Sequence, residues 1–272
     1  MPIVEITSRP RLSDTLREAW THRQLAFLLA RRNLKVRYMQ TALGSIWVVI
    51  QPLLLTGALT VVLGVFLAVP SDGVPYGLFA LSGMAVWSMF QRAVAESGLS
   101  LAASGNIVQK VYFPRILVPL SAVITAVVDF AFVYAVLLLG TIVMGYFPGW
   151  PILLSPLFAL LGAAMALACG ICVTIVDAVF RDVRHAVPSL LQLMFYASPV
   201  VYSDAIVPDH WRWLFQLNPL VGVIKGFRWS TLAGVPPPAM IDIAWSVGFT
   251  GLTLAFGLML FGRFETLAVD RI

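Results

Sequence analysis

Long apolar stretches separated by short polar turns recur along the whole chain. A helix needs about 20 apolar residues to cross roughly 30 Å of hydrocarbon. Hydropathy predicts six such helices, at residues 46–69, 76–95, 116–147, 152–176, 187–202 and 240–261. Turns containing Pro and Gly, at 70–75 and 148–151, separate two pairs of them. We therefore expect an all-α membrane protein whose single transmembrane domain covers residues 1–272.

Residues 1–45 precede the first span and have an amphipathic pattern. Apolar residues recur at spacings of about four and seven, and charged residues occupy the other faces. The apolar set is Leu12, Leu16, Trp20, Phe27 and Leu34. This pattern predicts a cytoplasmic helix that lies in the membrane interface, the alternative being a solvated helix. Thr21 and Gln24 fit a capping box, which predicts a helix start there.

Residues 203–237 are too interrupted to form a span. They contain two short helical patterns, at 209–217 and 219–232, separated by a helix-start signal at Asn218-Pro219. Aromatic residues crowd this stretch, as they do at a membrane interface. We expect a re-entrant pair of helices before the last span, the alternative being an extracellular loop. The candidates for an outer gate are Trp211, Trp213, Asn218 and Pro219.

Charge orients the predicted spans. Only 11% of the 272 residues are charged, 60% are hydrophobic, and the mean hydropathy is +0.90, which excludes a soluble fold. Eight of the eighteen basic residues precede residue 46, and alternate loops collect fifteen of the eighteen on the same side. Basic loops stay in the cytoplasm, so both termini are expected there, including the tail at 262–272. A basic membrane flank, and not nucleic-acid binding, explains the net charge of +5.

Small residues mark the fourth predicted span. Gly162, Ala166 and Gly170 lie four apart on one helix face, a spacing that lets helices approach closely. Cys169 and Cys172 occur in the same apolar stretch, without the strand and helix that accompany a redox motif. We interpret both cysteines as packing residues.

Several separate motifs then occur in one order along the chain. They are RRNLKVRY at 31–38, GSIW at 44–47 with Gln51-Pro52, QKVYFPR at 109–115, FRDVR at 180–184, SPVVY at 198–202 and Asn218-Pro219. In these motifs the chain resembles the permease subunits of type-2 ABC exporters, which move O-antigen, capsular polysaccharide or teichoic acid.

The resemblance implies a dimer of two copies of this chain in a bacterial cytoplasmic (inner) membrane, with two copies of a separate ATPase. It also implies a lipid-linked glycan or a polyol phosphate as cargo. No Walker-type G-x-x-x-x-G-K-[ST] occurs in the sequence. ATP and Mg are therefore expected on the partner ATPase, with no cofactor, metal or catalytic residue on this chain.

In such exporters, a coupling helix between the second and third spans docks on the ATPase, which corresponds here to residues 104–115. The expected contact residues are Asn106, Ile107, Gln109, Lys110, Val111, Tyr112 and Phe113. Independently of the family, the apolar members of this set lie in a cytoplasmic loop and require a surface to bury them, either on a partner or on the protein's own membrane domain. A second contact is expected at Arg181, Asp182 and Arg184, although charged loop residues are often only solvated.

Asp129 lies inside the third span, where an unpartnered carboxylate costs several kcal/mol. It is expected either to pack within the bundle or to line the pathway. Arg92 and Glu96, four apart, are expected to pair on one helix face. Aromatic faces let a sugar chain slide without tight hydrogen bonds, although each aromatic residue has the alternative of facing lipid or core. The substrate-path candidates are Trp47, Trp87, Phe90, Asp129, Tyr196 and Tyr202.

Two rival functions remain. One is a drug or small-lipid exporter of the same superfamily. The other is a polytopic membrane enzyme, which needs clustered polar residues at a membrane face. His22, His185 and His210 are instead scattered over different loops, without the spacing of metal ligands.

Overall fold

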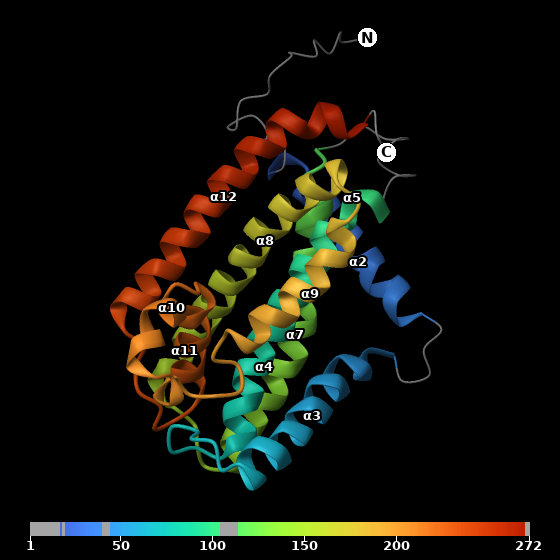
Figure 1. Cartoon of the computed structure of the whole chain (residues 1–272). Helices are drawn as coiled ribbons and strands as arrows, with labels where there is room; N and C mark the ends of the chain where they lie inside the picture. Colours follow the sequence, from blue (N-terminus) through green and yellow to red (C-terminus); the bar gives the residue numbers. More distant parts are fainter. Residues whose placement is uncertain (1–16, 18–19, 40–43, 104–113, 270–272) are drawn as a thin grey trace, which may run out of the picture.

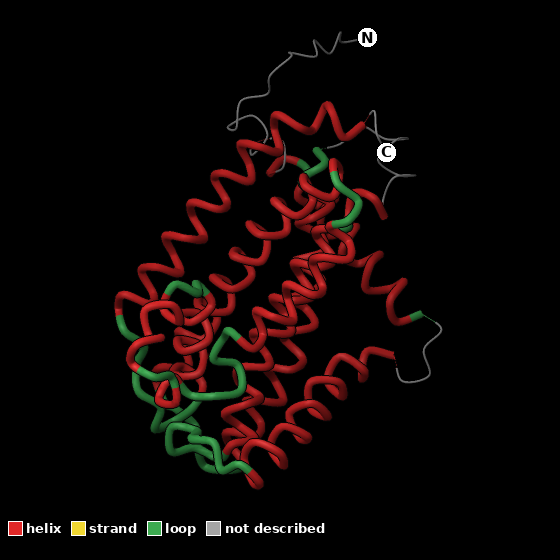
Figure 2. Tube along the Cα trace, in the orientation of Figure 1, coloured by secondary structure: helices red, strands yellow, loops and turns green. Residues whose placement is uncertain are grey.

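The structure, a computed structural model, describes residues 17, 20–39, 44–103 and 114–269, with side chains as far as Gly262. Helices and turns make up this part of the chain, with no strand among the described residues (Figure 2). Its main helices are α2 (Arg23–Tyr38), α3 (Trp47–Leu59), α4 (Tyr76–Gly98), α5 (Ser100–Ala103), α7 (Leu117–Val143), α8 (Ser155–Val179), α9 (Val183–Tyr196), α10 (Arg212–Gln216), α11 (Leu220–Thr231) and α12 (Met240–Val269). The predicted all-α membrane class is confirmed.

Five helical segments among the described residues are long and apolar enough to cross a membrane. They are Gly44–Phe66, which includes α3, Tyr76–Gly98 (α4), Leu117–Val143 (α7), Trp150–Val179, which includes α8, and Met240–Gly262 in α12. These segments agree with five of the six predicted spans. The 27 residues of α7 rise about 40 Å, at 1.5 Å per residue, which exceeds the hydrocarbon thickness as expected.

The predicted fifth span corresponds to α9, and its boundaries differ from the prediction. The helix begins at Val183 and ends at Tyr196, so its 14 residues rise about 21 Å. This is shorter than the predicted span at 187–202 and below the usual spanning length. Pro199 explains the early end, because proline has no N–H and disfavours helical backbone in the residue before it. Residues 197–202 form turns and bends instead.

The core lies where α4 is surrounded by α7, α8, α11 and α3. In the most apolar stretch of α4, 78% of the residues are buried, against 17% in the segment of α3 and in α12. Figure 1 shows α3 and α12 on opposite sides of the bundle, with α3 diverging from it at its N-terminal end and α12 running beside α8. These two helices therefore leave long apolar faces for lipid or for another chain.

Small residues bring α8 against α4, as their spacing predicts. A Cβ atom on Gly170 would lie 1.8 Å from Ser97 Oγ, and one on Gly162 would lie 3.2 Å from Met89 Cε. Only glycine at position 170 permits this approach. Cys169 and Cys172 occur on the same helix as free thiols that are partly buried.

Helix α2 packs on α7, but the face that it buries is not the apolar face that the amphipathic pattern predicts. Ala26 and Ala30 are buried, whereas Phe27, of the predicted apolar face, is 60% exposed. The predicted helix start is confirmed to within two residues, but the predicted capping box is not formed. The helix starts at Arg23 without a side-chain cap, and the Thr21 hydroxyl donates back to the carbonyl oxygen of Arg17.

The two short helices before the last span lie at the predicted positions. Helix α11 is buried against α4, α8 and α12, whereas no residue of α10 is buried. Figure 1 shows both helices near the end of the bundle where α12 begins. The re-entrant insertion of these two helices into the membrane stays a prediction.

Candidate functional site

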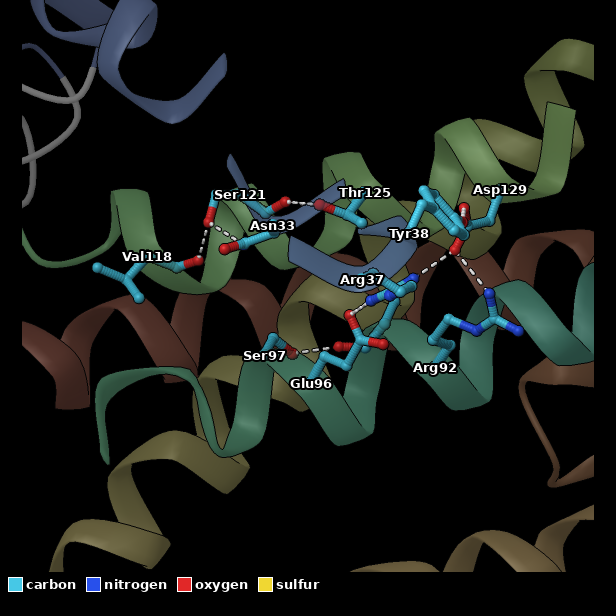
Figure 3. Close-up of polar contacts among 11 residues, drawn as sticks. Asn33, Arg37, Tyr38, Arg92, Glu96, Ser97, Val118, Ser121, Thr125 and Asp129 are labelled. Atoms are coloured by element: carbon cyan, nitrogen blue, oxygen red, sulfur yellow. Dashed lines mark hydrogen bonds and ion pairs between the residues drawn. The ribbon is translucent and has the colours of Figure 1, made fainter. Parts of the chain in front are cut away.

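A cluster of charged side chains joins α2, α4 and α7 inside the bundle (Figure 3). Asp129 of α7 has a side chain only 4% exposed. Its Oδ2 accepts hydrogen bonds from Arg92 Nη1 at 2.6 Å and from Arg37 Nη1 at 2.5 Å, and its Oδ1 accepts one from the Tyr38 hydroxyl. Arg37 also pairs with Glu96 of α4. We name Arg37, Tyr38, Arg92, Glu96 and Asp129 the charged cluster.

The charged cluster contains two cations and two anions, so its net charge is zero. A buried carboxylate is tolerated when it is paired and hydrogen-bonded, and the donors around Asp129 meet both conditions. Burial, together with the hydrogen bond to Asp129, raises the pKa of Tyr38 to about 12. The phenol therefore keeps its proton and remains a donor. The ion pairs of the cluster hold the N-terminal helix α2 against the membrane-spanning helices α4 and α7.

The predicted pair between Arg92 and Glu96 is not formed. Each residue bonds across the helix interface instead, Arg92 to α7 and Glu96 to α2. The two residues do share a face of α4, as their spacing predicts. Partners from the two neighbouring helices displace the intrahelical pair because they also neutralise the buried Asp129 and the partly buried Arg37, which would otherwise lack a counter-charge.

A groove of about 350 Å³ opens between α3 and α4 next to the charged cluster. Its lining residues are Gln51, Pro52, Leu55, Met84, Ser88, Gln91, Arg92, Ala95 and Glu96. The side chains of Gln51 and Gln91 are exposed, although both lie within membrane-spanning segments. Amides are disfavoured in contact with lipid chains, so this face favours water or another polar surface. Arg92 and Glu96 belong to both the groove and the cluster.

The aromatic candidates for the substrate path divide into buried and exposed rings. Trp87 and Phe90 are 2% and 1% exposed, so both lie in the core in this conformation and not on an open path. Trp87 Nε1 donates to Gln91 Oε1 at 2.9 Å, which orients one of the groove amides. Trp47 and Tyr196 are exposed, and the half-buried Tyr202 donates to the carbonyl oxygen of Tyr196. The path role of these last three residues stays a prediction.

Asn218, just before α11, connects the two short helices to the end of α9. Its Nδ2 donates to Ser198 Oγ at 2.8 Å and to the carbonyl oxygen of Ala197 at 3.1 Å. Its Oδ1 accepts from the backbone N–H of Leu220, which caps α11. The Pro219 carbonyl accepts from Ser246 Oγ on α12.

Trp211 and Trp213 are exposed, and their gate role stays a prediction together with that of Asn218 and Pro219.

The second predicted cytoplasmic contact lies at the turn between α8 and α9. Arg181 and Asp182 are exposed. Arg184 makes a two-point contact with Asp177, with distances of 2.7 Å from Nε and 3.1 Å from Nη2. This hydrogen bond and the adjacent negative charge raise the pKa of Arg184. The predicted coupling-helix residues, from Asn106 to Phe113, lie outside the described residues.

Sequence reasoning missed two members of the charged cluster, Arg37 and Tyr38. Both stand at the end of the RRNLKVRY motif, where Arg37 is one of eight basic residues ahead of the first span and Tyr38 is the last residue of the motif. It also missed Arg228 of α11, which is 2% exposed and yet charged. The only signal in the sequence is that these residues are spaced so as to share a helix face with apolar residues. That spacing shows that they are buried only once the face that packs against other helices is known.

The amino-acid sequence of this chain is similar to those of a known protein family and of several named proteins. Residues 24–232 match a family model described as ABC-2 type transporter. The chain is 28% identical to the O-antigen export system permease protein RfbA of Klebsiella pneumoniae. The alignment spans 246 residues and covers 89% of this chain and 92% of the relative. An RfbA of Myxococcus xanthus is 28% identical over 216 residues (78% and 82%). The polysialic acid transport protein KpsM of Escherichia coli is 21% identical over 239 residues (85% and 89%).

Proposed function

This chain belongs to the ABC-2 type transporter family, and from that membership we propose that it is the transmembrane subunit of an ABC exporter that moves a lipid-linked polysaccharide out of the cell. Its relatives are named for O-antigen export and polysialic acid transport, and they align over most of both chains. We extend the cargo class from those names to this chain. A polyol phosphate is the alternative cargo within the same proposal.

The groove between α3 and α4 is the observation that supports a polar cargo. Its exposed amides, Gln51 and Gln91, lie at membrane depth and offer hydrogen bonds to hydroxyl groups. We propose that two copies of the chain face each other across these grooves, so that the amides of both copies line one pathway. The small buried fraction of the α3 segment leaves a surface for that contact.

Energy for export is proposed to come from a separate ATPase, present in two copies, that binds ATP and Mg. The 104–115 segment and the turn around Arg181 are the proposed docking points on this chain. The charge bias along the sequence assigns both segments to the cytoplasmic side of the membrane. The protein would then occupy the bacterial cytoplasmic (inner) membrane with both termini inside.

A drug or small-lipid exporter is the second candidate, because the α3 and α12 faces are apolar. The polar groove favours the glycan, since a small apolar molecule gains nothing from exposed amides. An enzyme would require a catalytic constellation, whereas the charged cluster is fully paired within itself.

The proposal is tested in cells that depend on this chain for surface glycan. Deletion should remove glycan from the cell surface and cause lipid-linked glycan to accumulate inside, and the wild-type chain should restore export only together with its ATPase. A deletion strain with normal surface glycan and altered sensitivity to apolar drugs would instead support the second candidate.

A further inference from the structure

A second cavity, of about 310 Å³, lies beside α11. Its lining residues are Asp72, Pro199, Asp204, Lys225, Arg228, Val235, Pro236, Pro237 and Ala239. It shares no lining residue with the groove between α3 and α4. The loops that contribute to it precede α4 and α12, on the side that the charge bias assigns to the exterior. Its volume is near the lower limit of about 300–1,000 Å³ for ligand pockets, which fits one small molecule.

Arg228 supplies a buried donor to this cavity. Its Nη2 donates to the carbonyl oxygens of Pro199 and Val200, both at 2.9 Å, and its Nε donates to Ser82 Oγ at 3.2 Å. The guanidinium carbon lies 3.6 Å from the centre of the Phe79 ring. Among the described residues, Nη1 takes part in none of these bonds and no carboxylate pairs with the guanidinium. The Nη1 group of Arg228 can therefore donate hydrogen bonds to a ligand in the cavity.

Carboxylates provide acceptors in the same cavity. Ser203 Oγ donates to Asp72 Oδ1 at 2.5 Å, which leaves Asp72 Oδ2 outside this bond. Lys225 Nζ donates to Asp204 Oδ2 at 2.6 Å and to Asp242 Oδ2 at 3.2 Å. The lining thus has two acids and two bases. Lys225 is already neutralised, whereas Asp72 and Arg228 retain bonding capacity.

This combination selects a ligand with hydroxyl groups and no net charge. The two acids and the two bases of the lining balance one another, so the cavity gives no electrostatic advantage to a ligand with a net negative or a net positive charge. A hydroxyl group can donate to one carboxylate oxygen and accept from one guanidinium N–H at the same time. The remaining wall is aliphatic, formed by proline, valine and alanine side chains, and it suits the C–H face of a ring.

We propose that this cavity binds one neutral sugar unit of the exported glycan on the outer side of the transporter, an inference that rests on the proposed function for the identity of its ligand. Arg228 Nη1 donates to a ring hydroxyl oxygen, and a hydroxyl of the same sugar donates to Asp72. The site holds the emerging chain beside α11, away from the groove through which it travels.

Saturation-transfer NMR on the intact permease and ATPase complex tests the site. The probes are the methyl α-pyranosides of glucose, mannose and galactose, each without net charge. At least one should give a signal with the wild-type complex. Asp72→Asn should weaken its binding about tenfold, as expected for the loss of one hydrogen bond to a charged group. Ala239→Trp, which fills the cavity, should abolish the signal.

Ala205→Trp is the matched control, because Ala205 is an exposed alanine outside the lining, and it should bind like the wild type. Thermal unfolding of each variant shows whether it is folded. Absence of any sugar signal in the wild type, or equal signals in Ala239→Trp and Ala205→Trp, would overturn the inference. So would binding of dihexanoyl phosphatidylethanolamine that only Ala239→Trp abolishes, since the cavity would then be a lipid headgroup site.

Surface glycan is measured in the same strains to separate this inference from the proposed function. Normal wild-type export without sugar binding contradicts the outer site alone. Absence of glycan export by the wild-type chain with its ATPase contradicts the proposed function, whatever the cavity binds.

Discussion

Arg37 Nη1 lies 2.5 Å from Asp129 Oδ2, although the two residues are 92 positions apart in the sequence. This contact fastens the N-terminal helix α2 to the middle of α7. It also places Arg37 between Asp129 and Glu96, so that one guanidinium forms ion pairs with carboxylates on both α7 and α4. The charged cluster is consequently expected to be a main determinant of how α2 sits on the membrane domain.

Asp129→Leu should lower the stability of the protein strongly. Removal of the carboxylate leaves Arg37 and Arg92 without their shared counter-charge, and breaking a buried ion pair costs about 3–5 kcal/mol. We expect the lower part of that range, because both arginines are about a quarter exposed. Thermal unfolding in detergent measures the loss. Asp209→Leu is the control, since its side chain is 91% exposed, and equal losses in the two variants would contradict the assigned role.

Gly170→Ala should separate α4 from α8. The added Cβ would meet Ser97 Oγ at 1.8 Å, and overpacking of this kind costs about 1–3 kcal/mol. Ser97→Gly in the same chain should recover part of the stability, because it removes the atoms that clash. Gly248→Ala on α12 meets nothing within 4 Å and should be neutral. A double variant no more stable than Gly170→Ala would contradict this explanation.

Leu55→Trp should reduce export by narrowing the groove between α3 and α4. Leu55 lines that groove, whereas the adjacent Leu54 does not and is 66% exposed. The ratio of surface glycan to intracellular lipid-linked glycan should fall several-fold in Leu55→Trp and stay near the wild-type value in Leu54→Trp. Co-purification of the ATPase should be normal in both. Equal export by the two variants would show that the groove is not the path.

Tyr112→Asp combined with Phe113→Asp should abolish co-purification of the ATPase or uncouple ATP hydrolysis from export. The proposed docking segment offers these large apolar side chains to its partner, and burial of each contributes about 1.5–3 kcal/mol. Tyr112→Phe with Phe113→Leu keeps the surface apolar and should retain the complex. Full export by the double Asp variant would refute docking at this segment.

Cysteine labelling tests the proposed orientation. In a background with Cys169 and Cys172 replaced by Ala, a cysteine at Ser71 or Asp209 should react with an impermeant thiol reagent added to intact cells. A cysteine at Ser104 or Arg181 should react only after the cells are opened. The opposite pattern at either pair would contradict the assignment of both termini to the cytoplasm, which follows from the position of the basic residues.

Local features were predictable from the sequence because their physical causes are local. Twenty apolar residues in a row are sufficient for a span, so five long segments agree with the prediction to within a few residues. Asn218-Pro219 predicts the start of α11 because the asparagine side chain caps the helix two residues later. The spacing of Gly162, Ala166 and Gly170 likewise predicts a close helix contact. The early end of α9 is the exception, where the proline at 199 outweighed hydropathy.

Cross-helix relationships required the tertiary structure. The sequence places Arg92 and Glu96 on one face of α4, yet both bond to other helices, because the buried charge of Asp129 and the partly buried charge of Arg37 have to be neutralised. It contains eight tryptophans and cannot separate the buried ring of Trp87 from the exposed ring of Trp47. Helical periodicity determines which residues share a face, whereas the packing of neighbouring helices determines what that face meets.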